Sequence, residues 1–156
     1  MEPYELGAWR ADWAWGLPLI VLNAVVHVLG LGLINESVVR RLENVMDRRH
    51  YMARFAVAMS FTILLATGLH GFEAALWAAA YVALGALPDF KHAMLYSLSA
   101  LTSYGHANVF LAPHWQLMGA LEALNGMLLF GLTAAFLFST IQRAWPLRSR
   151  HRRPSA

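Results

Sequence analysis

The sequence contains no cysteine, and only 13% of its 156 residues are charged. The absence of cysteine excludes a disulfide framework, thiol chemistry and any metal site built on thiolates. The scarcity of charge, together with 58% hydrophobic residues, excludes an ordinary soluble domain, because so short a chain cannot bury that much apolar surface. We therefore expect an integral membrane protein whose surface is covered largely by lipid.

Motifs of enzymes are also missing. The sequence shows no nucleophile–base pair and no phosphate-binding loop, so we expect no enzymatic activity, no cofactor and no nucleic-acid partner. A removable signal peptide would begin with a basic segment. The first sixteen residues are instead acidic and aromatic, with Arg10 as their only basic residue, which is typical of an interfacial belt before a spanning helix.

Three apolar stretches are long enough to cross a bilayer, which takes about 20 residues. They cover residues 15–34, 55–87 and 115–141. As one helix, residues 55–87 would be about 50 Å long. Gly68 and Gly71 could bend or break this helix, and two separate spans are the alternative.

The distribution of positive charge decides between three and four spans. Five of the twelve Lys and Arg residues lie in Arg40–Arg54 and five in Arg143–Arg153. Three spans put both clusters in the cytoplasm, as the positive-inside tendency prefers, whereas four spans would separate them. We expect a bacterial inner membrane protein with its N-terminus outside and its C-terminus cytoplasmic. Residues 36–54 read as an amphipathic helix, whose arginines either bind anionic lipid or only fix the orientation.

Between the last two spans lies a helix too short to cross a membrane. Pro88 and Asp89 are good helix-start residues, and Ala93 to Leu101 forms the short apolar helix. A polar segment over residues 102–108 follows it. Irregular backbone is tolerated in hydrocarbon only beside protein or a water-filled cavity, and the negative end of a helix dipole favours a cation. The pattern predicts a re-entrant pore helix and filter loop.

From Ala93 onward the chain resembles the two-helix-plus-pore-loop module of potassium channels, in its short bacterial form with an additional N-terminal helix. The matching residues of the pore helix and loop are Ala93, Tyr96, Ser97, Leu98, Thr102, Ser103 and Gly105. Those of the last helix are Trp115, Leu117, Gly119, Glu122, Ala123, Asn125, Gly126, Leu128, Phe130, Gly131 and Ala135. One loop cannot enclose an axis, so we expect a homotetramer.

The resemblance implies a selectivity filter with three departures from the family pattern. Its residues are Thr102, Ser103, Tyr104, Gly105, His106, Ala107 and Asn108. The family has Tyr, Gly and Asp at the last three positions; a second register, which needs a gap, aligns Tyr104–Gly105 with its Tyr-Gly. Because backbone carbonyls form such a filter, we expect weak selectivity among monovalent cations such as potassium and sodium. His106 either faces the axis, where it could bind a metal or confer pH dependence, or points into the protein.

Several polar residues in the spans are further candidates. In the last span, Glu122, Asn125, Gly126 and Thr133 are expected to line the pore or support the filter. His70 and Glu73 share a helix face and form either a proton or metal site or a structural hydrogen bond, with no third ligand nearby in sequence. His27 is either a proton- or ligand-binding group or a neutral side chain packed on another helix.

The expected fold is an all-α membrane protein with three transmembrane helices and a re-entrant pore helix. Residues 1–54 form the first helix and a basic linker, residues 55–142 the pore module, and residues 143–156 a basic cytoplasmic tail. Within the module we expect an outer helix at 55–87, the pore helix and filter at 89–108 and an inner helix at 115–141. The predicted function is a tetrameric cation channel. The alternatives are a non-conducting scaffold and a haem-binding electron carrier that uses His27 and His70.

Overall fold

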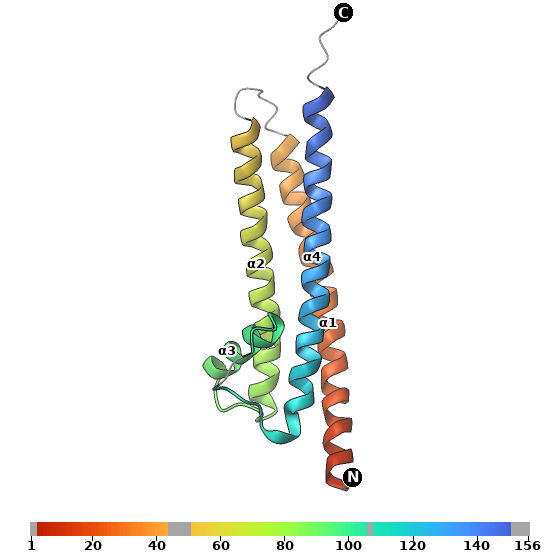
Figure 1. Cartoon of the computed structure of the whole chain (residues 1–156), viewed down its shortest axis with the longest axis vertical. Helices are drawn as coiled ribbons and strands as arrows, with labels where there is room; N and C mark the ends of the chain where they lie inside the picture. The colour runs from red at the N-terminus through yellow and green to blue at the C-terminus, as the bar shows by residue number, and fades with distance from the viewer. Residues whose placement is uncertain (1–2, 44–50, 106–107, 151–156) are drawn as a thin grey trace, which may run out of the picture.

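The computed structural model describes residues 3–43, 51–105 and 108–150, and within these ranges the chain is helical with no strand. The long helices are α1 (Pro3–Glu43), α2 (Tyr51–Ala83) and α4 (Gln116–Arg150). A short helix, α3 (Phe90–Leu101), and a 3-10 turn, η2 (Pro113–Trp115), lie between α2 and α4 (Figure 1). The all-helical fold predicted from the sequence is confirmed for the described residues.

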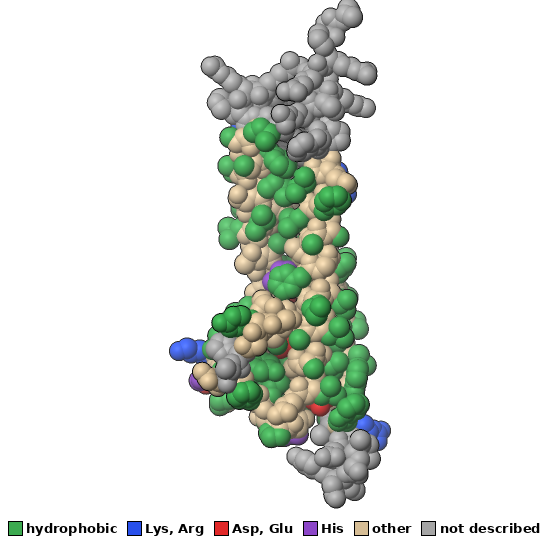
Figure 2. All heavy atoms as spheres, viewed as in Figure 1, with side chains coloured by type: hydrophobic (Ala, Val, Ile, Leu, Met, Phe, Trp, Pro, Cys, Tyr) green, Lys and Arg blue, Asp and Glu red, His purple; other side chains and the backbone are tan. Residues whose placement is uncertain are grey.

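Three helices are long and apolar enough to cross a membrane. The apolar spans are Trp9–Ser37, Met52–Ala83 and Pro113–Arg143, and they run side by side (Figure 1). Large apolar side chains are exposed along all three, among them Val21, Leu33, Val57, Leu64 and Met127. Figure 2 shows hydrophobic side chains over most of the visible face. A surface of this kind fits a protein embedded in a membrane.

The chain has two distinct ends along its long axis. The end of α1, the start of α2 and the end of α4 lie together at one end of the molecule (Figure 1). The N-terminus and the segment between α2 and α4 lie toward the other end (Figure 1). The ends of α1 and α4 and the start of α2, which flank the two arginine-rich stretches of the sequence, therefore lie on the same side of the bundle.

The second helix is continuous through Gly68 and Gly71 but ends at Ala83, four residues before the predicted end at residue 87. A Schellman motif ends it: the N–H of Ala86 donates to the Tyr81 carbonyl at 2.8 Å, and that of Gly85 to the Val82 carbonyl at 3.1 Å. Gly85 has φ +67°, a conformation that glycine adopts without strain. Apolar composition continued past this turn, so hydrophobicity alone placed the helix end too late.

The first and last helices extend beyond their predicted apolar spans. Helix α1 begins at Pro3 and contains Pro18 in its interior, whereas the predicted span began at residue 15. Helix α4 continues to Arg150, nine residues past the predicted end of the inner helix and into the predicted tail. The length of an apolar stretch predicts only the part of a helix that lipid covers. Arg, Glu and Gln are good helix formers, so a helix can continue through them beyond the apolar stretch.

The short helix α3 forms as predicted, with Asp89 as its N-cap: the Asp89 carboxylate accepts from the His92 N–H at 3.0 Å. Three of its four buried residues, Ala93, Ser97 and Leu101, follow the four-residue spacing of a single face. That face packs on α2 and α4. The core cluster formed here contains Trp77, Ala78, Tyr81, Ala86, Leu87, Ala93, Leu111, Trp115 and Met118.

Candidate functional site

A buried carboxyl group fastens α3 between α2 and α4. Glu122 of α4 is fully buried and accepts a hydrogen bond from the Tyr81 hydroxyl of α2 at 2.7 Å. Its other oxygen is hydrogen-bonded to the Ser97 hydroxyl of α3. Ser97 also lies 2.8 Å from the carbonyl of Ala74 in α2. One carboxyl group thus joins α2, α3 and α4.

Two glycines of α4 allow α3 to approach closely. Gly119 faces the ring of Tyr96, where a side chain would collide with the Tyr96 hydroxyl. About two helical turns further along α4, Gly126 faces the backbone of Leu101, and a Cβ at Gly126 would lie 2.7 Å from the Leu101 Cα. The end of α3 therefore rests against the backbone of α4.

This contact fixes how far α3 runs along the last apolar span. At 1.5 Å per residue, Gly126 lies about 20 Å along the helix axis from Pro113, in a span about 45 Å long. Leu101, the last residue of α3, therefore lies beside the middle part of the span Pro113–Arg143. In Figure 1, α3 lies beside α2 and α4 rather than beyond their ends.

The residues after α3 cap its C-terminus and are themselves non-helical. The N–H of Ser103 donates to the Ala100 carbonyl and that of Tyr104 to the Ser99 carbonyl, both at 2.9 Å. Ser103 has φ +55° and Gly105 has φ +69°. A non-glycine residue in this region is uncommon, and here Ser103 stands at the left-handed position of a Schellman motif.

The described residues of the predicted filter lie on the surface of the single chain. Thr102, Ser103, Tyr104, Gly105 and Asn108 are all exposed, and Tyr104 is 78% exposed. His106 and Ala107 lie outside the described residues. The polar segment is therefore available to a neighbouring copy or to water at the level of the span's middle.

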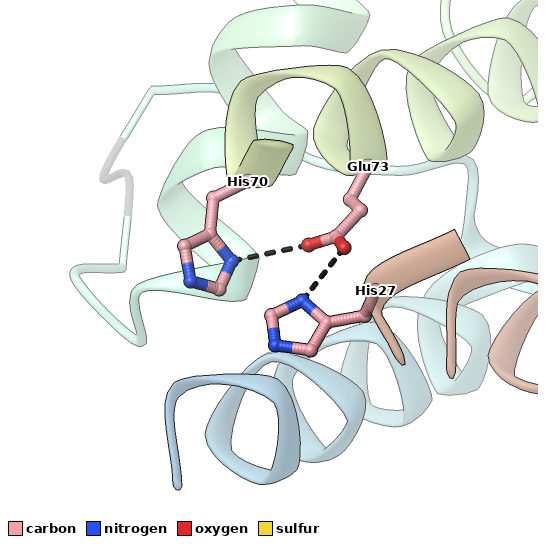
Figure 3. A group of neighbouring side chains, drawn as sticks. All are labelled: His27, His70 and Glu73. Atoms are coloured by element: carbon pink, nitrogen blue, oxygen red, sulfur yellow. Dashed lines mark hydrogen bonds and ion pairs between the residues drawn. The ribbon is translucent and has the colours of Figure 1, made fainter. Parts of the chain in front are cut away.

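A second buried cluster forms a closed ring of hydrogen bonds among α1, α2 and α4. Glu73 bonds both imidazoles: Nδ1 of His27 lies 2.8 Å from one carboxylate oxygen and Nδ1 of His70 lies 3.1 Å from the other (Figure 3). On their far sides, Nε2 of His27 and Nε2 of His70 lie 3.2 and 3.1 Å from the Thr133 hydroxyl. His27 and Glu73 are fully buried, and the His70 side chain is 12% exposed.

Comparison of the chain with protein-family models, with curated protein sequences and with solved structures finds no match. The function is therefore inferred from the geometry of the chain. This geometry consists of a short helix held at mid-span by Glu122, an exposed polar loop after that helix, and a buried ring that holds His27, His70 and Glu73 together.

Some of these contacts follow from the sequence and some do not. The predicted pairing of His70 with Glu73 is present as a hydrogen bond. The third partner, which was not found near this pair in sequence, is His27 of α1. The structural roles of Tyr81 and Ser97 were also missed. A polar residue on an otherwise apolar helix indicates that its side chain has a partner. The sequence does not show which partner, because that depends on how the helices pack.

The residues of α4 that were predicted to line a pore or support the filter lie inside the single chain. Glu122 and Asn125 are buried, Gly126 is covered by Leu101, and Thr133 is 8% exposed and bonded to the two histidines. Glu122 and Gly126 both contact α3, the helix that carries the polar loop. Thr133 instead belongs to the ring around Glu73.

Proposed function

We propose that the protein is a homotetrameric channel for monovalent cations, of the potassium-channel-like pore class. In this proposal α3 is a re-entrant pore helix and Thr102–Asn108 is the filter. The observation that carries the proposal is the contact between Leu101 and Gly126, because it holds the end of α3 beside the middle of an apolar span.

The exposure of this polar loop beside an apolar span supports an assembly of several copies. Thr102, Ser103, Tyr104 and Gly105 are non-helical and exposed. Lipid cannot satisfy the backbone polar groups of such a segment, so protein or enclosed water must cover it. Closed symmetry around an axis lets four copies cover one another's loops and enclose water between them.

The electrostatics of α3 favour a cation at the axis. Helix α3 enters from the end of the bundle that carries the N-terminus and directs its C-terminal end toward the middle (Figure 1). The C-terminal end of a helix carries partial negative charge and stabilises a nearby cation. Four such ends around an axis lower the cost of dehydrating a cation in the membrane.

The filter sequence supports conduction with weak selectivity. His106, Ala107 and Asn108 replace the Tyr, Gly and Asp of the family that the sequence resembles. A Cβ at position 107 disfavours the backbone conformations that glycine permits, and the acidic group of the mouth is lost. Fewer regular carbonyl sites discriminate less between potassium and sodium.

The proposed orientation follows the positive-inside tendency. The ends of α1 and α4 lead into the two arginine-rich segments, and this tendency favours that end as the cytoplasmic one in a bacterium, with the N-terminus outside. The filter loop is then reached from the outside. These arginines also face anionic lipid headgroups on the cytoplasmic side.

The arrangement of the two intramembrane histidines argues against a haem carrier. Two axial imidazoles lie on opposite faces of a porphyrin and are separated by its plane. Here both imidazoles bond the same Glu73 carboxylate and the same Thr133 hydroxyl, so nothing separates them. A non-conducting scaffold is the remaining alternative.

Cation flux into liposomes tests the proposal. Purified protein is reconstituted, its tetrameric state is checked by native mass spectrometry, and uptake is followed under potassium and then sodium gradients. We expect uptake of both ions from a tetrameric preparation. Folded tetramers without flux would favour the scaffold, and a folded monomer would contradict the pore.

A further inference from the structure

The ring of His27, His70, Glu73 and Thr133 has the form of a metal centre inside the helical bundle. We propose that it binds one first-row divalent transition metal ion, of the Zn²⁺ type, through Nδ1 of His27, Nδ1 of His70 and the Glu73 carboxylate. This inference does not rest on the proposed channel function. The site would join the first helix to the two long helices of the pore module.

The donor set suits this class of ion. The ligand atoms of His27, His70 and Glu73 all lie within 4.8 Å of one another. Figure 3 shows both imidazoles turning a nitrogen toward the same carboxylate. Two imidazoles and one carboxylate bind Zn²⁺, Co²⁺ or Ni²⁺ and leave a fourth position for water, whereas Ca²⁺ and Mg²⁺ prefer oxygen ligands alone.

Thr133 supplies the outer support that such ligands need. A metal-bound histidine normally donates its other ring N–H to an acceptor, which fixes the ring's orientation and tautomer. Here both Nε2 atoms lie within 3.2 Å of the Thr133 oxygen, and a hydroxyl oxygen has lone pairs for two donors. One hydroxyl therefore positions both imidazoles with Nδ1 directed at the metal.

The protein framework holds the ligands in place before the ion binds. His27 comes from α1, His70 and Glu73 come from α2, and Thr133 comes from α4. The His70 ring also stacks on Phe130, with ring centroids 4.2 Å apart. His70 is the most exposed of the three ligands, with 12% of its side chain accessible. A bound ion would link α1 to α2 directly and α4 through Thr133.

Titration of the tag-free full chain with Co²⁺ in detergent tests the site. Visible absorption reports Co²⁺ with nitrogen and oxygen ligands, and Zn²⁺ should displace it. We expect one equivalent for each chain in the wild type and in the His92→Ala and His114→Ala controls, whose side chains are exposed. We expect His27→Ala and His70→Ala to abolish stoichiometric binding.

A second variant separates loss of ligands from loss of folding. Thr133→Val keeps all three ligands and the side-chain volume but removes the shared acceptor, so we expect the dissociation constant for Co²⁺ to rise about 10–100-fold. Circular dichroism and gel filtration report whether each variant is folded. Absence of stoichiometric binding by the folded wild type would overturn the proposal. So would binding that persists in folded His27→Ala, or binding lost only in His106→Ala.

Discussion

Gly126 of α4 lies directly against the backbone of Leu101, the last residue of α3. This contact exists only because residue 126 has no side chain. It sets the depth of the loop that follows α3, and so it connects one position in the last helix with the placement of the proposed filter.

Replacing Gly126 with alanine should displace the end of α3. The new Cβ would meet the Leu101 backbone, and overpacking of this kind costs about 1–3 kcal/mol. We expect a lower midpoint of thermal unfolding and reduced cation flux in liposomes. Gly68→Ala is the matched control, since nothing lies within 4 Å of a Cβ at Gly68. Equal behaviour of the two variants would contradict the close contact.

Glu122 should tolerate an amide but not an apolar side chain. In Glu122→Gln the amide oxygen can accept from Tyr81, and the amide nitrogen can donate to Ser97 while Ser97 donates to Ala74. In Glu122→Leu the buried Tyr81 hydroxyl loses its partner, at about 1–3 kcal/mol for an unsatisfied group, and Ser97 keeps only the Ala74 carbonyl.

We therefore expect Glu122→Gln to keep the tetramer and its flux, and Glu122→Leu to lower the unfolding midpoint and lose flux. Native mass spectrometry and the liposome assay measure both. A Glu122→Leu variant as stable and as active as the wild type would show that the buried network does not hold α3.

Asp89 should stabilise the start of α3 in a pH-dependent way. Its hydrogen bonds from the His92 backbone N–H and then the His92 ring, at 3.0 and 2.6 Å, lower the Asp89 pKa below its ordinary value of 3.8. Because the pKa is lower in the folded state, the stabilisation is complete well above pH 3.8 and is lost as the pH falls through the lowered pKa.

Thermal unfolding of Asp89→Ala and Asp89→Asn checks this. At neutral pH we expect a lower midpoint for Asp89→Ala and one near wild type for Asp89→Asn, since asparagine is an equally good N-cap. The difference between wild type and Asp89→Ala should become smaller as the pH falls from neutral toward pH 2, because a protonated Asp89 accepts these hydrogen bonds less strongly. A difference that stays constant down to pH 2 would exclude the charged cap.

Introducing the filter residues of the potassium-channel family that the sequence resembles should raise the proposed selectivity. The triple substitution His106→Tyr, Ala107→Gly and Asn108→Asp introduces a phenol, a second glycine and an acidic group at the mouth of the proposed filter. We expect the potassium-to-sodium permeability ratio to rise by about tenfold or more, which corresponds to about 1.4 kcal/mol of discrimination. A wild-type ratio already as high as that of the triple variant would contradict the weak selectivity.

The sequence predicts the helices better than it predicts their contacts. Apolar length gave three spans, and Pro88–Asp89 correctly marked the start of α3, because both signals are local. The end of α2 was misplaced, since the turn at Gly85 lies inside an apolar stretch. The contacts of the buried ring could not be predicted, because they depend on the tertiary structure. His27 meets Glu73 only through the relative position of α1 and α2, and residue spacing within one helix does not encode that register.

The absence of cysteine makes the most direct test of the pore a simple one. A single cysteine at Ser103 gives a unique thiol in the proposed filter, and Val57→Cys places one on the exposed apolar face of α2. Flux is measured before and after a charged, membrane-impermeant thiol reagent. We predict that the reagent blocks cation flux in Ser103→Cys and leaves the wild type and Val57→Cys unchanged. Flux through Ser103→Cys that continues after the reagent has modified the thiol would contradict a water-filled cation pathway through this loop.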